Sequence, residues 1–229
     1  MKRVDCYGDD RILQGCFHCG GRPDTDDHSP PKVLLDKPYP AEMITVPACY
    51  ECNNSASLDE AYLACVIECT VTGNVSAESV SRTVIQKMLA HSPALASQMD
   101  AIRTMGENGP VFHPDPERVR RVIVKIARAH AAYELHEHFE EEPVSVRFFP
   151  LQMLSEEQQA EFERPAGSMM WPEVGSRAMQ RLVEGDPGDR PGWVEVQEGR
   201  YRYMAGIGDG RIVRMVMSEY LGCEVVWDF

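Results

Sequence analysis

The chain has 229 residues and a formal net charge of −13, with 43% hydrophobic and 26% charged residues. This length can bury a core in one large domain or two small ones, and the composition is that of a water-soluble globular protein. The negative charge opposes non-specific attachment to nucleic acid or to an anionic membrane. The first residues contain no apolar secretory stretch, and no run approaches the roughly 18 apolar residues of a membrane span, so we expect a cytoplasmic protein without a membrane partner.

The first 56 residues are rich in Gly, Pro, Asp and Cys and poor in long periodic segments, as is typical where a metal replaces an apolar core. They contain two C-x-x-C pairs, Cys16 with Cys19 and Cys49 with Cys52. The two-residue gap turns both sulfurs of a pair inward, so the spacing predicts one structural Zn²⁺ bound by four thiolates. Such a closed site leaves no position for water. Disulfides or buried free thiols are the alternatives.

His18 and the four other cysteines are not expected to bind the metal. His18 lies inside the first cysteine pair, and we expect it to be exposed and not to bind the metal. Cys65 and Cys69 lie four residues apart on a predicted helix, and with Cys6 and Cys223 they are expected to be thiols of the apolar core.

Helical signals dominate the middle of the chain. The capping box Ser57-Leu-Asp-Glu60 predicts the start of a helix that ends near residue 72. Two helices are expected over 77–91 and 93–104, separated by the N-cap and proline pair Ser92-Pro93. A loop over 105–114 and a long helix from about 115 to 139 follow.

The last third of the chain has the patterns of strands. Residues 144–149 alternate as a strand, 155–163 and 175–183 are predicted short helices, and strands are expected over 193–197, 200–204, 211–217 and 221–227. The predicted fold class is therefore α+β with an antiparallel C-terminal sheet. We expect three segments: 1–70 with the zinc site, a helical segment 71–140, and an α+β domain 141–229. A single domain formed by 71–140 and 141–229 is the alternative, because the break over 140–143 is short.

Asp27 and His28 lie between the two cysteine pairs, before a proline turn. Neighbouring side chains of an extended strand point to opposite faces, so one can bind a metal while the other acts on a water. A neutral histidine can take a proton from water at neutral pH. The Asp27 carboxylate with the side-chain oxygen of Asn53 suits a hard ion such as Mg²⁺ or Mn²⁺, which would stabilise charge on a scissile phosphate. An ordinary surface turn is the alternative.

Residues 16–70 resemble the zinc-bearing HNH endonucleases, whose ββα-metal motif reads C-x-x-C, Asp-His-x-x-Pro and C-x-x-C-Asn. The segments that resemble a bacterial and phage branch of this family are Cys16-Phe-His-Cys-Gly20, Asp27-His-Ser-Pro-Pro31, Ile44-Thr-Val-Pro-Ala-Cys49, Tyr50-Glu-Cys-Asn53 and Ser57-Leu-Asp-Glu60. The resemblance implies that His28 is the general base, that Asp27 and Asn53 hold the catalytic ion, and that the four cysteines hold structural zinc. It also implies a ββα unit formed by two strands and the helix from about residue 57.

The chain departs from this family at two places. Glu42 stands where the family usually has an asparagine that braces the histidine-bearing loop, and a glutamate there can brace the loop, join the metal or mark a loss of catalysis. The usual basic residue is missing beyond the second cysteine pair, in Asn54-Ser-Ala-Ser57.

The leading hypothesis is an endonuclease that hydrolyses DNA phosphodiester bonds. An acidic enzyme needs a local cationic track, because phosphate contacts supply most of the non-specific affinity. A row on one face of the predicted long helix is the candidate, with a solvated helix face as its alternative: Arg118, Arg121, Lys125 and Arg128.

The competing hypothesis is a catalytically inactive zinc module that binds a protein partner or nucleic acid, and a second copy of the chain also stays open as a partner. In the C-terminal sheet four aromatic residues are expected in the core, with base stacking as the alternative: Trp193, Tyr201, Tyr203 and Trp227.

Overall fold

The computed structural model describes residues 15–41, 43–107, 109–166, 176–185 and 190–229, and its secondary structure is α+β. The chain forms two compact units, one made of Met1–Ser55 and Ile123–Phe229 and the other of Ala56–Val122. The boundaries fall within helices α1 (Tyr50–Thr72) and α4 (Pro116–Leu135). The three-segment division expected from the sequence stays a prediction.

The first unit begins with an antiparallel hairpin of β1 (Thr25–Ser29) and β2 (Ile44–Ala48), in which His28 is paired with Thr45. Helix α1 follows at once, starting at Tyr50 and not at the predicted Ser57. The cause is a cap from a distant part of the chain, because the Tyr50 N–H donates to Asp24 Oδ1 at 2.6 Å. The Asp24 carboxylate thus accepts a hydrogen bond from an N–H of the first turn that has no partner within the helix. Its negative charge is also stabilised by the positive end of the helix dipole.

A five-stranded antiparallel sheet forms the other part of this unit, in the order β5-β9-β8-β7-β6. The strands are β5 (Ser145–Pro150), β6 (Val194–Gln197), β7 (Tyr201–Ile207), β8 (Arg211–Met217) and β9 (Leu221–Trp227). The predicted strands are confirmed, and the bounds of β8 and β9 coincide with the prediction. Helices α5 (Glu156–Glu163) and α6 (Arg177–Glu184) lie close to the predicted ranges, and Ser155 caps α5 in a capping box.

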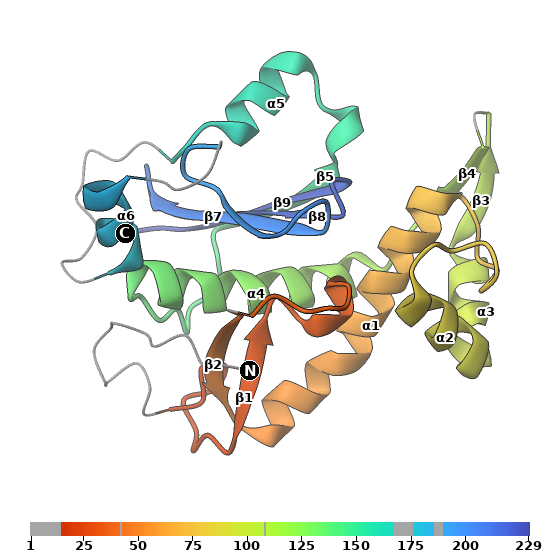
Figure 1. Ribbon diagram of the computed structural model, residues 1–229, viewed down its shortest axis with the longest axis horizontal. Coiled ribbons are helices and arrows are strands. Elements are labelled where there is room, and N and C mark those ends of the chain that lie inside the picture. Colours follow the sequence, from red (N-terminus) through yellow and green to blue (C-terminus); the bar gives the residue numbers. More distant parts are fainter. Residues whose placement is uncertain (1–14, 42, 108, 167–175, 186–189) are drawn as a thin grey trace. The chain divides into compact units, whose positions relative to one another are not determined.

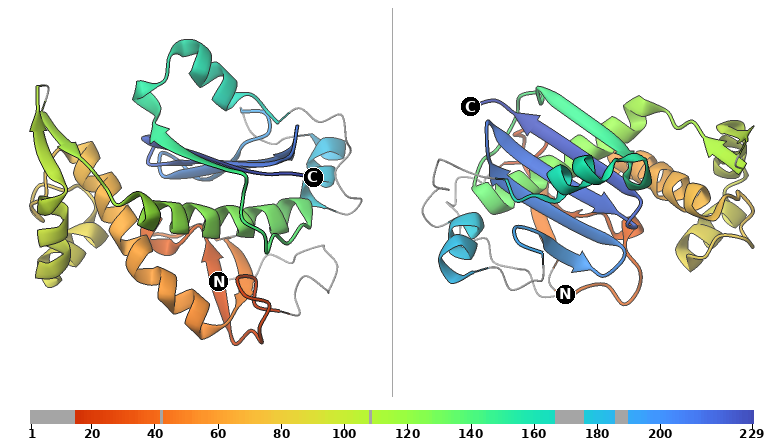
Figure 2. Two further views of the ribbon diagram at one scale, coloured as in Figure 1. Left: turned by 180° about the vertical axis from the view of Figure 1, so that it is seen from behind. Right: turned by 90° about the horizontal axis from the view of Figure 1, so that it is seen from above.

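The sheet is covered on both faces. The part of α4 from Ile123 onward lies between the sheet and the β1–β2 hairpin, and α5 lies over the opposite face of the sheet (Figures 1 and 2). Phe162 of α5 packs in a cluster with Trp193, Met204 and Val216. The expectation that the four aromatic residues of the sheet lie in the core is confirmed, since each is at most 6% exposed: Trp193, Tyr201, Tyr203 and Trp227.

The second unit contains the end of α1, helices α2 (Thr83–His91) and α3 (Pro93–Ala101), and the start of α4. An antiparallel hairpin of β3 (Arg103–Gly106) and β4 (Gly109–Phe112) replaces most of the expected loop over 105–114 and the end of the helix expected over 93–104. Burial raises the pKa of Cys65 to about 12 and that of Cys69 to about 11, as expected for core thiols. Cys223 is also buried, and Cys6 lies outside the described residues. No helix among the described residues is long and apolar enough to cross a membrane.

Candidate metal centre

The four predicted zinc ligands lie together. The sulfur atoms of Cys16, Cys19, Cys49 and Cys52 are all within 4.8 Å of one another, and the Sγ atoms of Cys19 and Cys49 are 3.8 Å apart. Zinc bound tetrahedrally at about 2.3 Å from each sulfur places the sulfurs about 3.8 Å apart. A disulfide would bring two sulfurs to about 2.05 Å, and all four cysteines are free. The four cysteines can therefore hold a zinc ion.

Backbone hydrogen bonds around the cluster favour the ionised form of Cys16. Burial alone would raise the pKa of Cys16, but hydrogen bonds from the backbone at Cys49 and His18 outweigh it and lower this pKa to about 6. The Cys52 N–H points to Cys49 Sγ at 3.4 Å. Burial and the neighbouring thiols raise the pKa of Cys52. A metal ion bound among the four sulfurs would allow all four thiols to be ionised at once, because a bound metal deprotonates the thiols that coordinate it.

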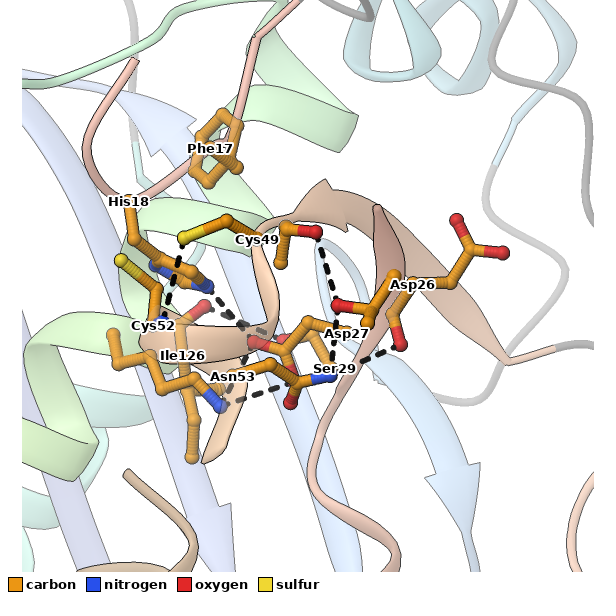
Figure 3. Close-up of polar contacts among 12 residues, drawn as sticks. Phe17, His18, Asp26, Asp27, Ser29, Cys49, Cys52, Asn53 and Ile126 are labelled. Atoms are coloured by element: carbon orange, nitrogen blue, oxygen red, sulfur yellow. Dashed lines mark hydrogen bonds and ion pairs between the residues drawn. The ribbon is translucent and has the colours of Figure 1, made fainter. Parts of the chain in front are cut away.

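His18 corrects a sequence-based expectation. Its side chain is 11% exposed, although we expected an exposed residue, and its Nε2 lies 2.8 Å from Asp27 Oδ2 (Figure 3). The preceding Phe17 is buried and packs on the ring of His138, which fixes the backbone between Cys16 and Cys19. His18 thus joins the cysteine cluster to the first strand. No local feature of the sequence marks this role.

The Asp27 carboxylate lies at the centre of the polar contacts on this side of the hairpin. It is 6% exposed, and Lys125 Nζ lies 3.0 Å from Oδ1 and 2.8 Å from Oδ2. Burial by itself raises the pKa of Asp27, but the hydrogen bond to His18 and the charge of Lys125 outweigh it and hold the pKa below the ordinary 3.8. Asp27 is therefore a buried carboxylate that is ionised at neutral pH.

Asn53 lies near the start of the same strand. In the first turns of α1 its Nδ2 donates to Thr25 Oγ1 at 3.3 Å and to the Asp26 carbonyl oxygen at 3.4 Å (Figure 3). Alternate residues of a strand share a face, so Thr25 and Asp27 point to the same side of β1. The hairpin and the helix therefore bring Asn53 and Asp27 to one face of the first strand.

His28 is the next residue of β1 and points to the opposite face of the strand from Asp27. It is half-buried. Burial and then the nearby charge of Lys32 lower the pKa of His28 below its ordinary 6.5, against the opposing effect of Asp27 and Asp26. His28 is therefore neutral at pH 7, which is the form that accepts a proton.

The four cations proposed as a nucleic-acid track all have partners. In the second unit Arg118 Nε and Arg121 Nε donate to the two oxygens of Asp59, at 2.6 and 2.8 Å. In the first unit Lys125 is bound to Asp27, and Arg128 lies 3.2 Å from Glu142. Their contact with nucleic acid stays a prediction, while Lys125 has a second role that the sequence did not indicate.

The described residues offer few ligands for a second metal. Glu42, which departs from the family pattern, lies outside the described residues. Within the described ranges, the four cysteines form the sole group in which three or more Cys, His, Asp or Glu ligand atoms come together. A divalent ion at Asp27 would therefore take its other ligands from the Asn53 amide, water and substrate.

The chain was compared with known proteins. No protein-family model, no curated protein and no solved structure matches it. The function is therefore inferred from the chemistry of the site.

Proposed function

We propose that this protein is an HNH-type endonuclease that hydrolyses DNA phosphodiester bonds with the help of a divalent ion. The observation that carries the proposal is the arrangement around β1. A hairpin and the following helix are joined at their base by four cysteines, and they place the ionised Asp27 and the amide of Asn53 on one face of a strand that carries a neutral histidine.

His28 is the proposed general base. Its neutral imidazole removes a proton from a water molecule, and the water oxygen attacks phosphorus while the bond from phosphorus to the leaving oxygen breaks. The lowered pKa of His28 keeps the imidazole neutral at neutral pH, so one ring nitrogen is free to accept a proton. The departing oxygen takes its proton from solvent. The four cysteines hold the strand and helix in place through structural zinc and take no part in the reaction.

Asp27 and Asn53 are the proposed ligands of Mg²⁺ or Mn²⁺. The ion, when bound, stabilises negative charge on the scissile phosphate and on the leaving oxygen. The oxygen donors fit such an ion, and an ionised carboxylate has about four lone-pair sites, so contacts with His18 and Lys125 do not exhaust it. Lys125 places a positive charge where the ion would bind, so the two compete for Asp27.

A cleavage assay tests the proposal. Wild type, His28→Ala and the control His91→Ala are incubated with supercoiled plasmid and either Mg²⁺ or Mn²⁺. We expect His28→Ala to nick DNA about 10²–10⁴-fold more slowly while its zinc content and thermal unfolding stay unchanged. His91 is exposed at the end of α2, and its replacement should leave the rate unchanged. Equal cleavage by wild type and His28→Ala would remove His28 from the mechanism.

A zinc module without catalysis is the second candidate. The ion pair between Asp27 and Lys125 favours it, because a buried carboxylate whose two oxygens already contact an ammonium is satisfied without a metal. The net charge of −13 favours it too. Titration of the zinc-loaded protein with Mn²⁺ separates the candidates, since a nuclease should bind Mn²⁺ in addition to zinc, and an inactive module should bind none.

A further inference from the structure

A cavity of about 400 Å³ lies in the unit that contains the five-stranded sheet, and none of the proposed zinc, Mg²⁺ or general-base residues lines it. Its walls come from the end of the β1–β2 hairpin, from α4 and α6, and from β6 and β7. Figure 1 shows α6 beside the carboxyl-terminal end of α4. Apolar and aromatic groups make up much of the lining, including Ile44, Tyr133, Val194 and Val196.

The inner wall of the cavity carries polar groups whose charges cancel. Glu134 and Tyr203 line the cavity and are each 1% exposed. The Tyr203 hydroxyl donates to Glu134 Oε1 at 2.5 Å, and Arg181 forms an ion pair with Glu134 Oε2. Behind them the His130 ring stacks on Tyr203, and burial lowers its pKa to about 3, so it adds no charge.

Arg177, unlike Arg181, forms no ion pair with a carboxylate of the described residues. Its guanidinium lies 5.9 Å from the centre of the Tyr133 ring, and its Nη1 donates to the neutral amide of Gln180 at 2.9 Å. Its Nε is buried without a hydrogen-bond partner. In the described part of the chain the Arg177 guanidinium therefore has no direct counter-ion, and it stands at the wall of a cavity that is lined by apolar and polar groups in about equal measure.

We infer that this cavity binds a small organic anion that carries a single negative charge on an apolar or aromatic body. One guanidinium without a counter-ion calls for one negative charge, and a partly enclosed site strengthens that attraction relative to water. A second negative charge on the ligand would meet Glu134 and Glu195, which also line the cavity. The volume lies within the range of small-molecule sites, which is roughly 300–1,000 Å³.

A carboxylate and a phosphodiester both have this chemistry. A free small-molecule acid would supply the first, and the end of a nucleic-acid strand would supply the second. The inference holds for either source and does not depend on the proposed nuclease activity.

Calorimetric titration of the full-length protein tests this site. The probes are phenylacetate, its neutral isostere phenylacetamide, and the dinucleoside monophosphate TpT, which has one phosphodiester charge. We expect one-to-one binding of at least one anion with a dissociation constant of roughly 10 mM or tighter, the range that so small a ligand reaches. Phenylacetate binding supports a carboxylate ligand, and TpT binding supports a strand end.

Variants identify the cavity as the site of binding. Arg177→Gln should weaken binding of the anion at least about tenfold, because it removes a charged hydrogen-bond donor. Val196→Phe should abolish binding by filling the cavity while Arg177 is kept, so it decides the matter even if Arg177→Gln folds poorly. The control Arg164→Gln changes an exposed arginine that pairs with Glu161 of α5 and does not line the cavity, and it should bind like wild type.

Three outcomes would overturn the inference. The first is that neither anion binds. The second is that phenylacetamide binds as tightly as phenylacetate and TpT does not bind. The third is that folded Arg177→Gln or folded Val196→Phe binds the anion as wild type does.

Discussion

Two regions of the first unit differ in whether a metal site helps to hold them. The hairpin region, residues 15–55, gathers four sulfurs and buries an ionised carboxylate. The sheet region, residues 145–227, buries apolar side chains, and Val213, Met215 and Val216 are fully inaccessible to solvent. The hairpin region also buries apolar side chains, and the sheet region also buries the ion pair of Arg214 with Glu224, so the feature that separates the two regions is the four-sulfur site, which can hold a metal ion. If this difference is real, substitutions in the two regions should change zinc content and stability separately.

Removal of one sulfur ligand should unfold the hairpin region. In Cys49→Ser the site keeps three thiolates, and much of the binding free energy of structural zinc, on the order of 10 kcal/mol, is lost from folding. Zinc content measured by mass spectrometry should fall well below the one ion per chain that we expect of wild type, and the thermal unfolding midpoint should fall with it.

The sheet region provides the matched control. Met215→Ala removes a buried side chain from the apolar core and should cost about 3 kcal/mol of the free energy of unfolding. Its zinc content should stay at one ion per chain. If Cys49→Ser kept its zinc, or if Met215→Ala lost it, the proposed division between the two regions would be wrong.

Lys125→Met should lower the stability of the protein, because it removes one partner of the buried ion pair. The substitution leaves the Asp27 carboxylate buried with His18 as its remaining partner in this contact, which should destabilise the protein by about 3 kcal/mol in denaturant unfolding at neutral pH. It also removes the ammonium that competes for Asp27, so Mn²⁺ should bind more tightly and restore part of the stability.

Lys87→Met is the control for that variant, because Lys87 is an exposed residue of α2. It should change neither stability nor Mn²⁺ binding. Unchanged stability in Lys125→Met would show that the ion pair contributes nothing to folding.

The pH dependence of cleavage should follow His28. A general base works in its neutral form, and the pKa of His28 is lowered below the ordinary 6.5. The rate should therefore rise with pH through a midpoint below 6.5 and be at its plateau by neutral pH, when measured as cleavage rate against pH at constant Mn²⁺. A rate that still rises between pH 7 and 8 would assign the proton transfer to another group.

A cap in the sheet region should have the smallest effect. The Ser155 hydroxyl oxygen accepts a hydrogen bond from the Gln158 N–H, and the Ser155 N–H donates to Gln158 Oε1, so Ser155→Ala removes half of this capping box. We expect a loss of about 1 kcal/mol in denaturant unfolding, with zinc content unchanged. Ser97→Ala, at an exposed position inside α3, is the control and should not destabilise the protein.

The sheet region could be predicted closely from sequence because its signals are local. Strands β8 and β9 have the predicted bounds, and helix α5 lies within the predicted range 155–163. The four cysteines could also be predicted to gather, since their spacing depends on the geometry of short turns.

The errors arose where distant residues decide the local structure. Helix α1 starts early because Asp24 caps it from 26 positions away, which no helix-start pattern contains. The contact between Lys125 and Asp27 joins residues 98 positions apart. The row of cations along the long helix therefore could not predict it. The prediction for His18 was wrong because its partner Asp27 lies nine positions further along the chain, in β1.

The most direct test of the proposed nuclease site is the position of a second metal. Crystals of the zinc-loaded protein grown with Mn²⁺ should show two anomalous scattering peaks, a zinc peak among the four sulfurs and a manganese peak between Asp27 and Asn53. The manganese peak should disappear in Asp27→Asn. A zinc peak alone, at Mn²⁺ concentrations that support DNA cleavage, would contradict the assignment of Asp27 and Asn53 to the catalytic ion.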